Sequence, residues 1–229
     1  MSVLRKPFLY LGALWIALVP LAAVAAGTAT VVDRTSGSGE TMKLAWQDDG
    51  SLRINVDAEN PDEFMLIRDG KVYAVAFEDG APLVMEVSGM LKAMGGMLQN
   101  GLGADQPLPA DIASVEPTGQ TETVAGLPGR VYRITAVDAD GERTSVEAVL
   151  TDDARAAEMT RVFMTGILSL FGQGQADDFL AALPADGKGM LRYGSDYALG
   201  SISGQAPHAD QFELPAPPVD LAEMLKRAQ

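Results

Sequence analysis

Cysteine is absent from the 229-residue sequence, and histidine occurs once, as His208. A chain without thiols forms no disulfide bonds and no thiolate zinc sites, and it has no cysteine nucleophile. A single imidazole also excludes metal sites built from several histidines. Because no Gly-x-Ser-x-Gly motif accompanies His208, we expect this side chain to be exposed or to cap a segment end.

Positive charge and aromatic side chains are scarce. The chain has 17 lysines and arginines against 31 aspartates and glutamates, a net charge of −14, and aromatic residues make up 6% of it. Such an acidic surface repels phosphate groups, which excludes nucleic-acid binding, and it favours a soluble monomer. A hydrolase that uses two carboxylates stays open as an alternative, because such pairs are set by space and not by sequence spacing. The sequence itself predicts no catalytic residue, no metal site and no cofactor.

Long apolar runs are missing except at the N-terminus. There, Arg5 and Lys6 precede the apolar run Phe8–Leu21, and the small residues Ala22–Ala26 follow it. This order of a basic start, an apolar centre and a small-residue end is typical of a secretory signal peptide. We therefore predict a signal peptide over residues 1–26, with cleavage after Ala25 or Ala26.

A retained membrane anchor is the alternative for this segment, because Phe8–Ala26 is just long enough to span a bilayer. Pro20 and the run of alanines favour cleavage instead. An exported chain without disulfides fits a bacterial periplasm better than a secreted animal module, so we predict a periplasmic location.

Asp-Gly pairs punctuate the sequence at residues 49–50, 69–70, 79–80 and 140–141. Asp-Gly between apolar runs is a strong signal for a β-hairpin, because both residues tolerate positive φ. Strands are expected over 41–46, 51–57, 63–68, 71–77, 82–87, 114–125, 130–137 and 143–151, with weaker strands over 188–193 and 197–203. A further turn is expected at residues 126–129.

Both faces of residues 63–68 and 71–77 are apolar, which predicts cover on both sides of that part of the sheet, with a helix as one cover. Helices are expected over 88–100, 152–171 and 177–183. Many strands with a few inserted helices indicate an α+β fold, a curved antiparallel sheet with helices on one face. We expect a single domain over residues 27–206 and a Pro-rich tail over 207–229 that ends in a short helix, Val219–Arg227.

Two features invite a metal-binding interpretation. Asp138, Asp140 and Glu142 could suggest calcium, but a calcium-binding loop starting at Asp138 would need a carboxylate where Val149 stands. A tight hairpin turn explains the same residues. The second feature is the methionine stripe of the 88–100 helix, which could bind copper(I) but has the spacing of any apolar helix stripe. Methionines that fill gaps in a core are the plain interpretation of that stripe.

Two stretches resemble a known group of proteins. They are Ser51–Val56 with Phe64–Tyr73, and Thr118–Arg133. They resemble an uncharacterised family of exported bacterial proteins that is similar in architecture to the periplasmic lipoprotein carrier LolA. The resemblance covers roughly Thr41–Phe171. It implies a half-barrel, a curved antiparallel sheet closed by helices around an apolar cavity.

The first functional hypothesis is a non-catalytic binding module for an apolar ligand, such as a lipid or the acyl chain of a lipoprotein. The residues expected to contact the ligand are three from a strand wall and three from a helix that acts as a lid: Tyr73, Val75, Phe77, Met90, Met94 and Met97. The second hypothesis is a structural or interaction protein of the cell envelope with a packed core, which acts on an envelope protein through its surface or its Pro-rich tail.

Overall fold

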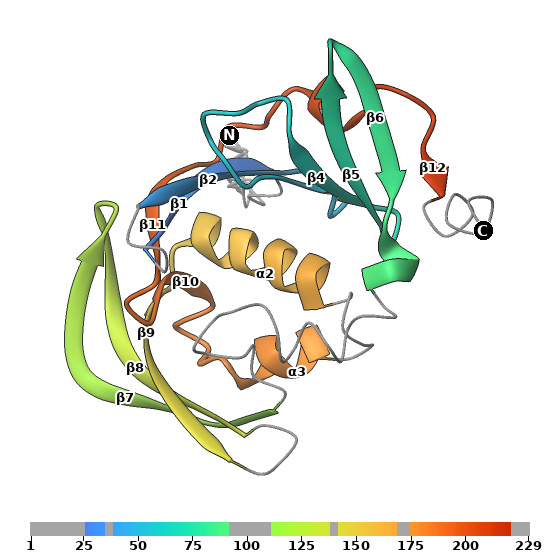
Figure 1. The fold of residues 1–229 in the computed structure, drawn as a ribbon. Coiled ribbons are helices and arrows are strands. Elements are labelled where there is room, and N and C mark those ends of the chain that lie inside the picture. Colours follow the sequence, from blue (N-terminus) through green and yellow to red (C-terminus); the bar gives the residue numbers. More distant parts are fainter. Residues whose placement is uncertain (1–25, 35–38, 92–110, 138–141, 169–174, 221–229) are drawn as a thin grey trace, which may run out of the picture.

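A computed structural model describes residues 26–34, 39–91, 111–137, 142–168 and 175–220 of the chain. In these residues twelve strands form one open sheet (Figure 1). The strands are β1 Gly27–Asp33, β2 Glu40–Trp46, β3 Leu52–Asn55, β4 Phe64–Arg68, β5 Lys71–Glu78, β6 Ala81–Glu86, β7 Asp111–Val124, β8 Leu127–Val137, β9 Arg143–Thr151, β10 Gly189–Tyr193, β11 Tyr197–Ser203 and β12 Val219–Asp220.

The order of strands across the sheet is β12-β6-β5-β4-β3-β2-β1-β11-β10-β9-β8-β7. Eleven of them pair antiparallel, and β12 joins β6 in parallel. The sheet therefore consists of two antiparallel runs, β1–β6 and β7–β11, which meet where β1 pairs with β11. This confirms the predicted α+β class and the antiparallel sheet.

The hairpin turns explain much of this order. At two of the Asp-Gly pairs both residues have positive φ, 53° and 70° at Asp69 and Gly70, and 50° and 78° at Asp79 and Gly80. Positive φ at both central residues is the geometry of the two-residue turn that matches the twist of paired strands. The turn predicted at residues 126–129 is placed wrongly, because the observed turn begins one residue earlier and is shorter. Val124 pairs with Leu127, so the turn consists of residues 125–126, and Pro128 and Gly129 belong to β8.

Two helices pack against one face of the sheet, called the inner face here: α2 Ala154–Leu168 and α3 Gln175–Ala182 (Figure 1). Both were predicted, α2 with the wider bounds 152–171 and α3 with the shifted bounds 177–183. Helix α2 approaches the sheet closely at Gly166, where an added Cβ would lie 3.2 Å from Ile67 and 3.3 Å from Leu52. Of the predicted helix over 88–100, residues 88–91 are helical and the rest lie outside the described residues.

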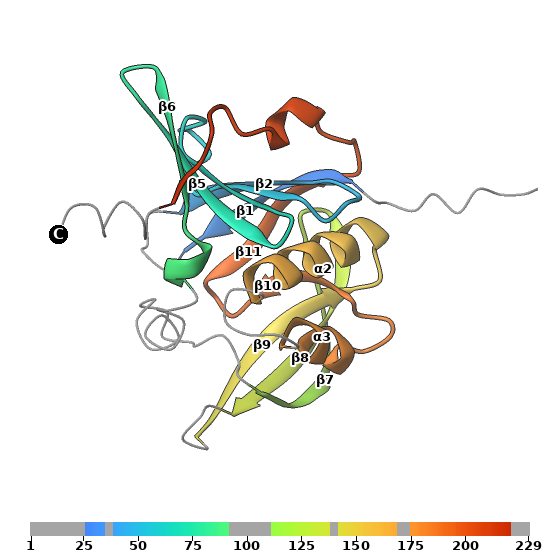
Figure 2. The ribbon, with the colours of Figure 1, turned by 90° about the vertical axis from the view of Figure 1, so that its right-hand side faces the viewer.

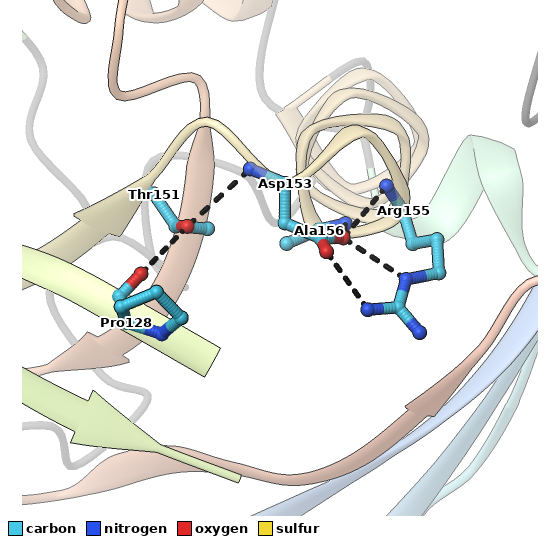
Figure 3. A network of polar contacts seen from close by, with 5 residues as sticks. All are labelled: Pro128, Thr151, Asp153, Arg155 and Ala156. Carbon is cyan, nitrogen blue, oxygen red and sulfur yellow. Dashed lines mark hydrogen bonds and ion pairs between the residues drawn. The ribbon is translucent and has the colours of Figure 1, made fainter. Parts of the chain in front are cut away.

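Helix α2 begins at a network of polar contacts (Figure 3). Asp153 Oδ1 accepts hydrogen bonds from the backbone N–H groups of Arg155 and Ala156, at 3.0 and 3.3 Å. These are the groups that a helix leaves unpaired at its start, so Asp153 is the N-cap residue. The Arg155 guanidinium also donates to this carboxylate, and Thr151 links the cap to Pro128 of β8. The side-chain hydrogen bonds from Arg155 are the main reason that the pKa of Asp153 lies below its ordinary value.

Replacing Asp153 with Ala is expected to lower the free energy of unfolding by about 1 kcal/mol at neutral pH, the usual value of an N-cap. Folding lowers the pKa of the Asp153 carboxyl group. The carboxylate therefore stabilises the folded protein fully above the unfolded-state pKa of about 4. This stabilisation is lost as the pH falls through the lower pKa of the folded state. Urea unfolding of both proteins from neutral to acidic pH measures this, and their difference should shrink below about pH 4. Asp152→Ala is the control, because the cap hydrogen bonds from the N–H groups of Arg155 and Ala156 go to the carboxylate of Asp153, the next residue in the chain. A difference that persisted at low pH would contradict the account.

The other face of the sheet, called the outer face here, is covered over β2–β6 by the C-terminal segment. This segment contains the 3₁₀ helix η1, Ala209–Phe212, and then β12. Figure 2 shows η1 and α2 on opposite sides of the sheet. The two-sided cover predicted for β4 is thus confirmed, with α2 beside Ile67 on one side and this segment on the other. On β5 the segment buries Tyr73 and Val75, whereas Ala74 on the inner face stays half-buried. The predicted helix Val219–Arg227 is wrong at its start, because residues 219–220 form β12. Its remaining residues lie outside the described ones.

Candidate functional site

An apolar row crosses the inner face from strand to strand. Cross-strand partners in register form it, and they are Ala29, Leu44, Ile54, Met65, Ala74, Met85 and Val219. Burial along this row falls in one direction. Ile54 is 4% exposed, Met65, Ala74 and Met85 are half-buried, and Val219 is 40% exposed. The row therefore continues beyond the part of the sheet that is well covered.

The position of α2 explains this gradient. The helix contacts mainly β10, β1, β11 and β3, so its cover weakens toward β5, β6 and β12. The neighbouring row, Leu52, Ile67 and Val72, is buried. Leu52 and Ile67 lie beside Gly166 of α2, and the backbone of Val72 is hydrogen-bonded to residues 87 and 88. Apolar side chains left partly exposed on a concave face are typical of a binding surface.

The helical turn at residues 88–91 borders this region. Its first residue, Ser88, is held by the sheet, because its hydroxyl accepts the backbone N–H of Val72 at 2.8 Å. Leu91 then packs against the same inner cluster as Met65, Ala74 and Met85. We call Met65, Ala74, Met85, Leu91 and Val219 the inner apolar face.

The predicted ligand-binding residues fall on different sides of the sheet. Tyr73 and Val75 are buried on the outer face, in a cluster with Phe212 of the C-terminal segment. Phe77 is exposed near the tip of the β5–β6 hairpin, and Met90 is exposed beside the inner apolar face. Met94 and Met97 lie outside the described residues. The structure therefore does not bring Tyr73 and Val75 to the side of the sheet on which Leu91 lies.

The sequence predicts that the side chains of β5 alternate between two apolar faces. It does not predict which of these faces is the inner face of the sheet and which is the outer face. Val72 and Ala74 share one face, and Tyr73 and Val75 share the other. Both sets are apolar, so the choice between them depends on where α2 docks, and no local signal gives that position. Met65 and Met85 were missed for the same reason.

A polar cleft of about 390 Å³ lies on the other half of the sheet, between β7, β8 and the end of β9. Its wall contains Glu122, Arg130, Asp152 and Asp186. Two of the carboxylates are occupied by ion pairs, because Arg130 pairs with Asp186 and Arg192 donates to Glu122 at 2.8 Å. Hydrogen bonding to Tyr132 and the nearby Asp186 carboxylate raise the pKa of Arg130. These pairs favour a role in holding β7, β8 and β10 together.

A second polar cleft, of about 450 Å³, is lined by residues 39–41 and 56–59. It includes three acids, Glu40, Asp57 and Glu59. Within the described ranges, however, no group of three or more His, Asp or Glu side chains is arranged to hold a metal ion. Asp138 and Asp140, considered above for calcium, lie outside those ranges.

Helices that could cross a membrane were sought in the part of the chain that the structure describes, and none there is both long and apolar enough. Comparisons with protein-family models, with curated proteins and with solved structures find no match for this chain.

Proposed function

We propose that this protein is an exported, non-catalytic binding module that holds an apolar ligand, such as the acyl chain of a lipid or lipoprotein, against its inner apolar face. The observation that carries the proposal is the fall in burial along the row from Ile54 to Val219. A row of apolar side chains that continues past its helix cover offers a surface that water solvates poorly.

The chemistry of this face suits a flexible chain. Met65 and Met85 flank Ala74 across β4, β5 and β6. Methionine side chains are unbranched and polarizable, and they adapt to ligands of variable shape. Because the Ala74 side chain between them is small, we expect an acyl chain to lie across the strands at this position. This arrangement supports the proposed carrier function, and the periplasm is proposed as its location from the signal-like N-terminal segment and the absence of cysteine.

Replacing Met85 with Lys is expected to weaken binding of a long-chain fluorescent fatty acid at least about tenfold, because a cation would have to be desolvated where the chain lies. Titration of the probe into purified full-length protein, followed by fluorescence, measures the dissociation constant. Val56→Lys is the matched control. Val56 is 55% exposed and lines the second polar cleft, so the same charge there should leave the affinity for the fatty acid unchanged.

Circular dichroism of both variants separates lost binding from lost folding. Equal affinities of the Met85 variant, the Val56 variant and the parent protein would overturn the proposal for this face. Absence of saturable binding by the parent protein, tested with fatty acids of several lengths, would overturn the acyl-chain function itself.

A further inference from the structure

The outer face carries an apolar groove that the C-terminal segment fills. Phe212 is 4% exposed and packs in one cluster with six side chains of β2, β4, β5 and β6. These side chains are Ala45, Phe64, Leu66, Tyr73, Val75 and Val84. Leu214 and Ala216 pack against the same cluster as the segment continues. We call the six strand residues, from Ala45 to Val84, the outer groove. We call residues 207–220 the C-terminal strap.

Two arginines hold the strap by its backbone. Arg53 Nη1 donates to the carbonyl oxygen of Gln211 at 3.2 Å, and Arg68 Nη1 donates to the carbonyl oxygen of Phe212 at 2.9 Å. Arg53 also lies over the ring of Phe64, 3.5 Å from its centroid, which fixes the guanidinium at the edge of the groove. The groove thus recognises the backbone of a peptide together with one aromatic side chain.

The strap reaches the groove through a short exposed hinge. β11 ends at Ser203, and η1 begins at Ala209. Between them, residues 204–206 and His208 are exposed and Pro207 is half-buried. The backbone N–H groups of Gln205 and Gln211 donate to acceptors close in sequence, Ser203 Oγ and the carbonyl oxygen of His208. A C-terminal segment that docks through side-chain and backbone contacts beyond such a hinge has the form of an exchangeable element.

We propose that the outer groove is a peptide-binding site, and that the strap of a second copy of this chain can fill it in place of the chain's own strap. The two straps are identical, so every contact of Phe212 and of the two carbonyl oxygens is reproduced in the exchanged dimer. The difference between the two states is then set by the hinge and by concentration. A strap on a short hinge has an effective concentration in the millimolar range, so the single chain prevails at low protein concentration.

This inference does not rest on the proposed ligand function, because the outer groove lies on the opposite side of the sheet from Met65, Ala74, Met85 and Leu91. Val219 is the one residue that the strap shares with the inner apolar face, and an exchanged strap would supply the same Val219 beside Met85. The recognition chemistry is also different. The inner apolar face would accept a chain without polar groups, whereas the outer groove requires carbonyl oxygens for Arg53 and Arg68. Failure of one proposal therefore leaves the other standing.

The test uses the full-length protein with Phe212→Ala, which empties the centre of the groove, and a fluorescent peptide with the sequence of residues 207–220. Fluorescence anisotropy should show saturable binding of this peptide to the variant, and binding at least about tenfold weaker to the unchanged protein, whose groove is occupied. A peptide that itself carries Phe212→Ala is the matched control, and it should bind the variant at least about tenfold more weakly. Equal binding of the two peptides would overturn the proposal.

A second variant covers the case in which Phe212→Ala fails to fold. Deleting Gln205 and Ala206 shortens the hinge between β11 and η1 by about 7 Å, and we expect this to keep a strap from reaching its own groove. Light scattering after size exclusion should then show a dimer. A folded monomer with this shortened hinge would overturn the proposal, because it would show that the strap does not cross to a second copy.

Discussion

Replacing Trp46 with Ala is expected to lower the free energy of unfolding by about 3–5 kcal/mol, a large share of the stability of an ordinary domain. Trp46 is fully buried in the inner cluster, at the end of β2. Its ring lies so close to Gly27 that a Cβ there would be 2.5 Å from the indole. Truncation to Ala leaves a cavity that the surrounding strands cannot close. Urea unfolding followed by far-ultraviolet circular dichroism measures the loss.

Trp46→Phe is the informative comparison. Among the described residues, Trp46 Nε1 is the one buried side-chain nitrogen or oxygen without a hydrogen-bond partner. Phenylalanine keeps most of the ring and removes this donor, so no hydrogen bond is lost and part of the packing is retained. We expect the Phe variant to lose clearly less stability than the Ala variant. Equal losses would show that the indole N–H makes a contact that matters, contrary to this account.

Replacing Gly189 with Val is expected to destabilise the protein by about 3 kcal/mol or more, at the upper end of the cost of overpacking. Gly189 begins β10 and lies against the start of α2. A Cβ at this position would lie 2.8 Å from the backbone carbon of Ala156 and 2.8 Å from the backbone nitrogen of Ala157. Backbone atoms of a helix cannot rotate away as a side chain can, so α2 would have to move off the sheet.

The same junction depends on Thr160, whose hydroxyl donates to the carbonyl oxygen of Ala156 and accepts the N–H of Met190, both at 2.8 Å. Moving α2 would break this link between helix and strand. Gly89→Val is the matched control, because among the described residues no atom beyond its own helical turn lies within 4 Å of a Cβ there, and its effect should stay within about 0.5 kcal/mol. Thermal or urea unfolding compares the two. A Gly189 variant as stable as the control would mean that α2 and β10 are not packed as described.

The strands and their turns were largely predictable because their signals are local. Asp69-Gly70 and Asp79-Gly80 adopt positive φ for reasons contained in two residues. The helix over 154–168 was equally predictable from its apolar stripe. The turn at residues 125–126 was missed, because Ala125 adopts a φ of 50° that its residue type does not favour. Pairing of Val124 with Leu127, and not local preference, holds that conformation.

The role of the C-terminal segment was not predictable. A Pro-rich stretch reads as a loose tail, yet Phe212 enters the outer groove and two arginines from β3 and β4 hold its backbone. The signal that could have suggested docking was the apolar outer face of β4 and β5, which requires some cover. Sequence alone offered a helix for that cover, because nothing in a strand indicates which distant segment will pack on it.

By itself, the sequence determined the acidic surface, the absence of thiol chemistry, the antiparallel strands and the main helix, since each follows from composition or from contacts between close neighbours in the chain. Only the tertiary structure decided which apolar face of β5 lies on the inner face of the sheet, with α2, and which lies on the outer face, under the strap. It also decided that cover on the inner face weakens toward Val219. Those choices depend on packing between segments far apart in sequence, such as Phe212 in one cluster with Val75 and α2 against Leu52. No local sequence pattern predicts the free energy of such packing.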